Sequence, residues 1–66
     1  MNPNKLKGKL VEKNLTYEDC SKILDISTTT FSNKVNGISR FYVCEAKLLS
    51  NILELSDLEK IEIFLN

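Results

Sequence analysis

Two short stretches in the middle of the chain, residues 17–24 and 28–36, repeat apolar residues at helical spacing. Their apolar positions are Cys20, Ile23 and Leu24 in the first stretch and Phe31 and Val35 in the second. Apolar side chains three or four residues apart share one face of a helix, so each stretch predicts a short helix with one buried stripe. Ile26 lies between the stretches and is expected to fill the turn. The pattern predicts two helices joined by a tight turn.

Residues at the ends of these stretches support the same boundaries. Thr16 and Ser27 stand where N-cap residues belong, because a Ser or Thr oxygen can accept a hydrogen bond from a backbone N–H of the first turn. Gly37 stands just beyond the second helix, where glycine readily takes the left-handed conformation of a helix C-cap. We therefore expect a helix-turn-helix over about residues 16–37.

The second helix of this pair has a polar outer face. This face carries small hydrogen-bonding side chains and no carboxylate: Thr28, Thr29, Ser32, Asn33 and Asn36. Phe31 and Val35 hold the opposite face in the core. The outer face is therefore suited to contact with a polar partner.

Three more helices are expected around this pair, over residues 4–13, over residues 42–53 and after Ser56. The expected buried residues are Leu6, Leu10 and Val11 in the first of them and Ala46, Leu49, Ile52 and Leu53 in the second, with Phe41 packed ahead of it. Ser56 and Glu59 have the spacing of a capping box, which begins the last helix. The expected fold is all-α, a compact five-helix bundle in a single domain spanning residues 1–66.

The last predicted helix has more apolar residues than one stripe can hold. Leu58, Ile61 and Leu65 share a helical face and are expected to point inward, while Ile63 and Phe64 lie away from it. Uncovered apolar side chains indicate contact with another surface, so we expect a two-fold homodimer with Ile63 and Phe64 at its interface. For Phe64, an edge of the chain's own core is an alternative.

Composition narrows the class of protein. Apolar residues make up 42% of the 66 residues and charged residues 27%, which is typical of a globular domain rather than a disordered segment. The chain has no apolar run near the ~20 residues of a membrane span and no signal-peptide pattern, so we expect a soluble cytoplasmic protein with no membrane partner. Cys20 and Cys44 fall on expected core faces without the spacing of a metal motif, so we expect reduced, buried cysteines.

The formal net charge is zero, but the charges are unevenly distributed. Residues 1–40 carry seven basic and four acidic side chains, a net charge of +3, and residues 41–66 carry two basic and five acidic ones, a net charge of −3. We therefore expect a molecule that is basic on the half with the helix-turn-helix and acidic on the other half, an arrangement that would orient it toward phosphates.

Several residues of the central pair resemble the helix-turn-helix core of the phage Cro and repressor family of small prokaryotic transcription regulators. The matching positions are Leu15-Thr16, Cys20-Ser21, Leu24, Ile26-Ser27, Thr30-Phe31-Ser32 and Gly37. Asp25 replaces the glycine that is common in the turn, and aspartate tolerates the left-handed conformation needed there. Tyr17 replaces a common glutamine, and a phenol donates only one hydrogen bond.

The resemblance implies a lambda-repressor-like DNA-binding domain that acts as a small, phage-type repressor. The second helix of the motif would lie in the major groove of double-stranded DNA, with Thr28, Thr29 and Asn33 expected to contact base edges. Residues expected at the DNA backbone are Tyr17, Ser27, Ser32, Asn36 and Arg40. Threonine methyls and Asn33 favour thymine and adenine edges, so the half-site is expected to be rich in A·T pairs.

Catalysis is not expected from this inventory of side chains. The chain has no histidine, its cysteines lack a neighbouring base, and its two glycines do not form a phosphate-binding loop, so we expect no enzyme, no cofactor, no metal and no small-molecule substrate. The alternative function is a helical protein-interaction module, an antirepressor or adaptor that uses the same fold without DNA. A polar, acid-free outer helix face favours DNA, whereas an apolar or aromatic hot spot there would favour a protein partner.

Overall fold

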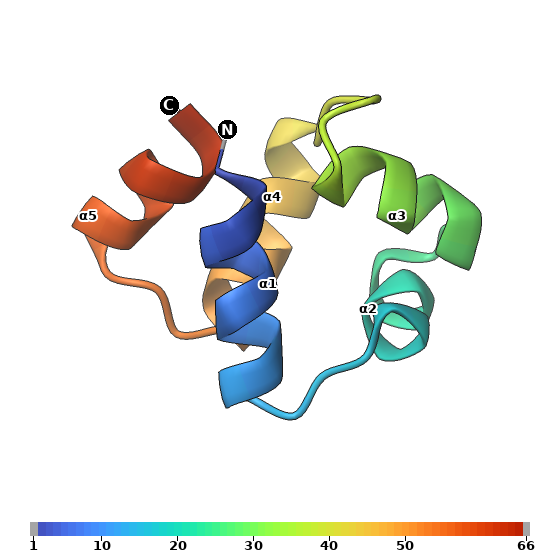
Figure 1. The fold of residues 1–66 in the computed structure, drawn as a ribbon, viewed down its shortest axis with the longest axis horizontal. Coiled ribbons are helices and arrows are strands. Elements are labelled where there is room, and N and C mark those ends of the chain that lie inside the picture. The colour runs from blue at the N-terminus through green and yellow to red at the C-terminus, as the bar shows by residue number, and fades with distance from the viewer. Residues whose placement is uncertain (1, 66) are drawn as a thin grey trace.

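Residues 2–65, the part of the chain that the computed structural model describes, form five α-helices without a strand (Figure 1). The helices are α1 (Pro3–Glu12), α2 (Tyr17–Leu24), α3 (Thr28–Val35), α4 (Val43–Ile52) and α5 (Asp57–Lys60), and α5 continues directly into a π-helical turn, η1 (Ile61–Leu65). The predicted all-α fold with five helices is confirmed. The predicted bounds of the first four helices agree with the observed ones to within one residue at each end.

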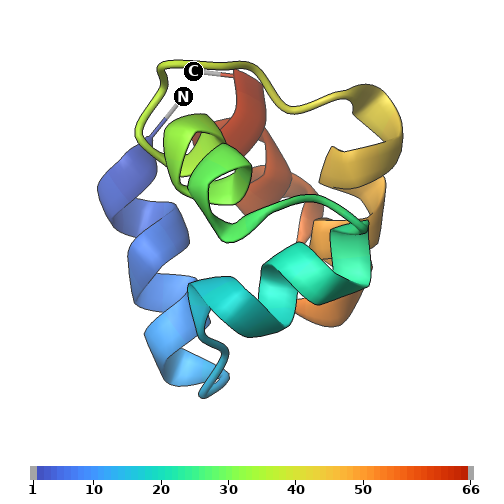
Figure 2. The ribbon, with the colours of Figure 1, turned by 90° about the vertical axis from the view of Figure 1, so that its right-hand side faces the viewer.

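The helices are arranged around α1, with α2 and α3 on one side of it and α5 with η1 on the other (Figures 1 and 2). The two ends of the described chain meet, because the backbone N–H of Asn2 donates to the carbonyl of Ile63 at 3.1 Å. This hydrogen bond ties the start of α1 to η1. The reader helix proposed from the sequence, α3, thus lies on the opposite side of α1 from the C-terminal segment.

The N-terminal caps form as the sequence predicts. The Thr16 hydroxyl accepts from the Asp19 N–H at 3.1 Å, and the Asp19 carboxylate accepts in return from the Thr16 N–H at 3.0 Å. Ser27 accepts from the Thr30 N–H at 3.0 Å and so begins α3. These bonds satisfy backbone donors that have no partner within the helix, which fixes where α2 and α3 start.

Left-handed residues end three of the helical segments where the sequence allows it. Gly37 has φ +81°, Asp25 has φ 58° and Asn14 has φ 56°. Asparagine and aspartate tolerate this conformation better than other residues with a Cβ. Asp25 therefore takes the place of glycine in the turn between α2 and α3, as predicted.

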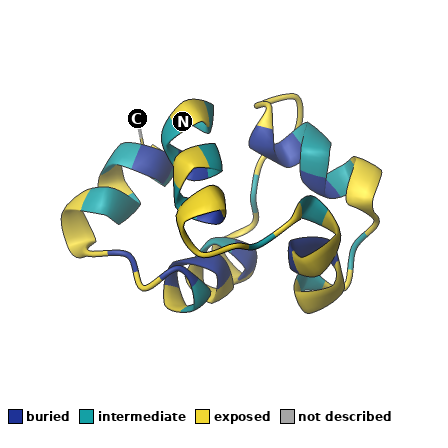
Figure 3. Cartoon of the chain, turned by 60° about the horizontal axis from the view of Figure 1, so that its bottom comes forward, coloured by how far each residue is buried: buried dark blue, intermediate teal, exposed yellow. Residues whose placement is uncertain are grey.

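A single apolar core is shared by α1, α2, α3, α4 and η1. Its buried members are Leu6, Leu10, Cys20, Phe31, Val35, Leu49, Leu53, Leu55 and Ile63. Figure 3 shows the buried residues on the inward sides of the helices. An aromatic row crosses this core: the Phe31 ring packs edge-on against Tyr17 and Phe41, with centroids 5.3 and 6.0 Å apart, and Phe41 packs edge-on against Phe64 at 5.6 Å. The row joins α2, α3, the loop before α4, and η1.

Three residues of the first four helices that were predicted to be buried are exposed. Val11 is 76% exposed and Ile23 is 43% exposed. The inward stripe of α1 is formed by Leu6 and Leu10 and that of α2 by Cys20 and Leu24, so Val11 and Ile23 lie beside these stripes. Cys44 is also exposed, because α4 turns Leu49 toward the core and Cys44 projects from another side of the helix. Cys20 is buried as predicted.

The predicted orientation of the C-terminal helix is wrong. Ile63 is fully buried, whereas Leu58, Ile61 and Leu65 are 65%, 48% and 77% exposed. Phe64 is partly buried against the core, as the alternative reading had it. Ile63 therefore cannot form a dimer interface, and the face that the sequence assigned to the core is the one that faces outward.

Ion pairs along α1 accompany this orientation, in which Ile63 lies in the core. Two lysines of α1, and a third directly after it, pair with three glutamates of the C-terminal part of the chain. The pairs are Lys5 with Glu62, Lys9 with Glu59, and Lys13 with Glu54 at 2.9 Å. Turning Glu59 and Glu62 toward α1 also turns Ile63 into the core, with the π-helical turn altering the normal helical register.

The same pairs overturn the predicted separation of charge. The basic charges of α1 are matched by the acidic charges of the C-terminal segment across their contact, so the excess of each half along the sequence is largely neutralised in space. The hydrogen bond from Lys9, together with the backbone N–H of Ser56, lowers the pKa of Glu59 to about 2. The pKa of Lys9 is raised in return by Glu59.

The register of η1 predicts a contrast between two isoleucines that are two residues apart. Ile63→Ala removes atoms from a fully buried side chain and should cost about 2–5 kcal/mol of unfolding free energy. Ile61→Ala removes the same atoms from a half-exposed side chain and should cost about 1 kcal/mol or less. Urea unfolding followed by circular dichroism measures both. Equal losses for the two variants would contradict this burial pattern.

Candidate nucleic-acid interface

The helix-turn-helix holds α3 against α2 through small side chains. Ser21 is buried, its hydroxyl donates to the Glu18 carbonyl at 2.8 Å, and the same hydroxyl lies 3.3 Å from the Thr28 hydroxyl. Phe31 and Val35 are fully buried beneath α3. The opposite side of α3 is left facing outward (Figure 2).

The three predicted base contacts differ in how available they are. Thr28 and Thr29 are exposed, and Asn33 is half-buried. The Thr28 hydroxyl faces Ser21, so its methyl group is the part left for an external contact. Within residues 2–65 the side chains of Thr29 and Asn33 make no hydrogen bond. Thr29 and Asn33 lie one turn apart and form the strip of α3 that is ready to donate and accept.

The predicted backbone contacts divide in the same way. Ser27 is exposed, but its hydroxyl already accepts from the Thr30 N–H and donates to the Thr30 hydroxyl at 2.7 Å. Asn36 is exposed and donates to the half-buried Ser32 hydroxyl at 3.3 Å. That bond is long and lies at the surface, so Asn36 is available to exchange it for another acceptor.

Tyr17 and Arg40 complete the predicted backbone set. Tyr17 is half-buried, and its ring packs against Phe31, so it has a core role that the sequence did not assign to it. Arg40 is exposed in the loop between α3 and α4, and none of the carboxylates in the described chain forms an ion pair with it. An unpaired guanidinium is well suited to a phosphate, which it can bind with two parallel hydrogen bonds.

A buried ion pair fixes the loop that carries Arg40. Lys34 and Glu45, whose side chains are only 7% and 8% exposed, lie 2.5 Å apart between Nζ and Oε1. The same carboxylate oxygen accepts from the Tyr42 N–H at 2.8 Å, and Lys34 Nζ lies 4.2 Å from the centroid of the Tyr42 ring. The pair joins the end of α3 to the start of α4.

Electrostatics favour the charged state of this buried carboxylate. Burial alone would raise the pKa of Glu45, but the hydrogen bonds from Lys34 and from the Tyr42 N–H outweigh it and lower the pKa. Sequence analysis missed this pair. Its signals were the spacing of Lys34 on the stripe of Phe31 and Val35, and the position of Glu45 three residues after Tyr42, the N-cap of α4.

Few basic groups remain without an acidic partner. Among residues 2–65, the cations outside any ion pair are Lys7, Arg40 and Lys47. The surface around α3 is therefore only weakly basic. α3 itself has no carboxylate; on α2, Glu18 is paired with Lys22 at 3.3 Å and Asp19 is held in the cap, and the turn before α3 carries the exposed Asp25.

Other kinds of site find no support in the described part of the chain. No three metal-binding side chains among residues 2–65 gather at one place, and none of the helices there has the length and apolar character to cross a membrane. Burial raises the pKa of the Cys20 thiol, which keeps it protonated and unreactive.

Comparisons of this chain with protein-family models, with curated proteins and with solved structures found no match.

The buried pair predicts non-additive losses of stability. Lys34→Met strands a buried carboxylate and Glu45→Met strands a buried ammonium, so each should cost about 3–5 kcal/mol. The double variant leaves no unpaired charge and should lose clearly less than the sum of the two single losses. Urea unfolding of the four proteins gives the coupling energy. Additive losses would show that the two charges do not depend on each other.

Proposed function

We propose that this protein binds double-stranded DNA in a sequence-specific manner, as a small transcriptional regulator of the repressor type, with α3 as the reading helix. The observation that carries the proposal is the outer strip of α3. It has unoccupied polar groups at Thr29 and Asn33, has no carboxylate, and rests on a rigid base formed by Phe31 and Val35. The resemblance of residues 15–37 to the Cro and repressor helix-turn-helix supports the same function.

In the proposed complex α3 lies in the major groove with its N-terminal end toward the bases. Thr28 presents its methyl group to a thymine methyl, Thr29 presents a hydroxyl, and the Asn33 amide pairs with an adenine edge. Asn36 and Arg40 bind phosphates on either side of this contact. Bound at a promoter, the domain would repress transcription by occupying the site.

The other predicted phosphate ligands have smaller parts in this proposal. The Ser27 hydroxyl is committed to the α3 cap, so its backbone contact requires its remaining lone pair or a bridging water. Ser32 is half-buried under Asn36, and Tyr17 has its ring in the core. Arg40 therefore carries most of the proposed backbone electrostatics. With so few unpaired cations, the logarithm of the affinity should fall only gently with the logarithm of salt concentration.

A homodimer remains part of the proposal, through a different face from the one predicted. Leu58 and Leu65 are largely exposed and Ile61 is half-exposed, and the three are spaced along one side of α5 and η1. A two-fold contact between two such faces would cover them and would place two copies of α3 on successive half-sites, ~34 Å apart. This face replaces Ile63, which is buried.

Selection of duplexes from a random library tests the DNA proposal without knowledge of the operator. A binding sequence should be enriched, and Thr29→Ala and Asn33→Ala should each weaken its affinity by about 1–3 kcal/mol while leaving a scrambled duplex nearly unaffected. Asn4→Ala, an exposed asparagine on α1, is the matched control and should change neither affinity. Equal losses on both duplexes would make these residues backbone contacts. No enriched sequence would favour the protein-interaction alternative.

Sedimentation at several concentrations tests the dimer. Leu58→Glu introduces a charge on the proposed interface and should shift the protein to monomer with unchanged stability. Val11→Glu places the same charge on an equally exposed aliphatic residue of α1 and should leave the dimer intact. A wild-type protein that stays monomeric at high concentration would rule the interface out.

A further inference from the structure

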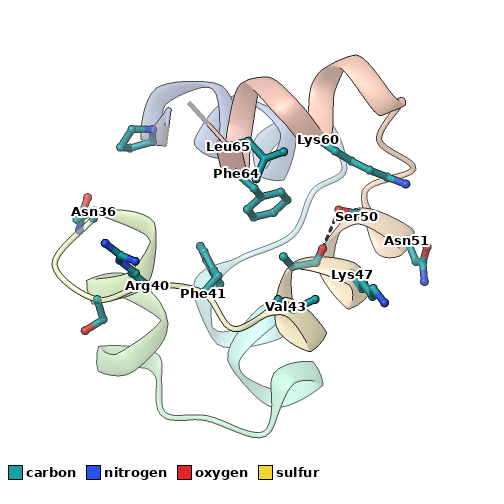
Figure 4. A pocket seen from close by; sticks show the side chains of 14 residues that line it. Asn36, Arg40, Phe41, Val43, Lys47, Ser50, Asn51, Lys60, Phe64 and Leu65 are labelled. Atoms are coloured by element: carbon teal, nitrogen blue, oxygen red, sulfur yellow. Dashed lines mark hydrogen bonds between the residues drawn. The ribbon is translucent and has the colours of Figure 1, made fainter.

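An open groove of about 1050 Å³ runs between the loop after α3, helix α4 and the turn η1 (Figure 4). Its floor is aromatic, because Phe41 and Phe64 meet there edge to face, with ring centroids 5.6 Å apart. Val43, which lies outside the proposed dimer face, adds aliphatic surface and is 74% exposed. The apolar surface is therefore presented to the outside rather than covered by the chain.

The charged residues that line this groove, among those described, are all basic. Its basic lining residues are Arg40, Lys47 and Lys60, and none of its described lining residues is acidic. Arg40 and Lys47 lack an ion-pair partner in residues 2–65, and Lys60 has only a long contact of 3.8 Å with Asp57. The chain has as many acidic as basic side chains, so a groove bordered by cations alone is a local departure from the balance of the whole.

The groove also has polar lining residues. Asn36, Ser39 and Asn51 are exposed lining residues with side chains that donate and accept hydrogen bonds. The Ser50 hydroxyl, by contrast, already donates to the Ala46 carbonyl at 2.7 Å. Amides and hydroxyls of this kind suit the backbone of an extended or helical segment.

We propose that this groove docks a short acidic segment of a partner protein, one that carries aromatic or aliphatic anchors. The anchors would pack on Phe41 and Phe64, and neighbouring carboxylates would meet Arg40 and Lys47 at the border. The volume lies at the upper limit of small-molecule pockets, and lining residues such as Arg40, Val43 and Lys47 are exposed, which suits a peptide better than an enclosed ligand. This docking does not depend on the proposed DNA binding, although an occupied groove would take Arg40 away from a phosphate.

Selection from a phage-displayed library of random 12-residue peptides tests the proposal on the intact chain. Peptides that combine Asp or Glu with Phe, Leu or Trp should be enriched. An enriched peptide, labelled with fluorescein, should bind about tenfold more weakly when its carboxylates are replaced by amides. Failure to enrich acidic peptides, or equal binding of the amide form, would overturn the proposal.

Variants and chemical-shift mapping locate the bound peptide. Three substitutions of exposed lining residues should each weaken binding about tenfold: Arg40→Glu, Lys47→Glu and Val43→Asp. Lys22→Glu, at an exposed residue of α2 far from the groove lining, is the control and should have no effect. In ¹⁵N-labelled protein the peptide should shift amides of residues 36–51 and 60–65. Unchanged binding by the groove variants would overturn the proposal. So would loss of the groove to a second copy of the chain at high concentration, or equally tight binding of phenylbutyrate, a small apolar anion.

Discussion

Phe31 lies where the separate parts of this short chain meet. Its ring is fully buried and contacts Tyr17 of α2 and Phe41 of the loop before α4, and Phe41 in turn contacts Phe64 of η1. A chain of this length buries only about 60% of the surface that it exposes when unfolded, so it has too little apolar surface to form a second core. The same row of aromatic rings therefore supports α3 from within, through Phe31, and forms the floor of the groove, through Phe41 and Phe64.

The buried Lys34–Glu45 pair has a second positioning role. It joins the last turn of α3 to the first turn of α4, and the Tyr42 N–H shares the same carboxylate. The loop between these helices, which carries Arg40, is thereby held at both ends. Because Arg40 borders the groove and is also the strongest candidate for a phosphate contact, the geometry of this loop bears on both proposed interactions.

The charges of this protein are used mainly within the fold. Lysines of α1 pair with glutamates near the C-terminus, and only a few cations are left for external partners. Long-range attraction of nucleic acid is correspondingly weak. A DNA-binding function of this molecule would thus depend more on direct contacts from α3 than on a basic surface. Because unpaired cations are few, the three basic residues that line the groove are a distinct local feature.

The sequence by itself determined the local features of the fold. Thr16, Ser27 and Ser56 begin their helices, and Asn14, Asp25 and Gly37 take left-handed conformations, because caps and turns depend on residues within a few positions of one another. The inward stripe of α3 was also predictable, since Phe31 and Val35 leave no other apolar face. For the candidate site, the sequence supplied the exposed polar strip with Thr29 and Asn33.

Only the tertiary structure decided which way the C-terminal helix faces and where the charges go. Helical spacing shows that Leu58, Ile61 and Leu65 lie together opposite Ile63, but it cannot say which side meets the core. In the fold Ile63 joins the shared apolar core, and Glu59 and Glu62 pair with lysines of α1 on the same contact. The groove is likewise assembled from three segments that are distant along the chain, so neither its aromatic floor nor its uniform charge has a local pattern. Periodicity defines faces, and packing against distant residues assigns them.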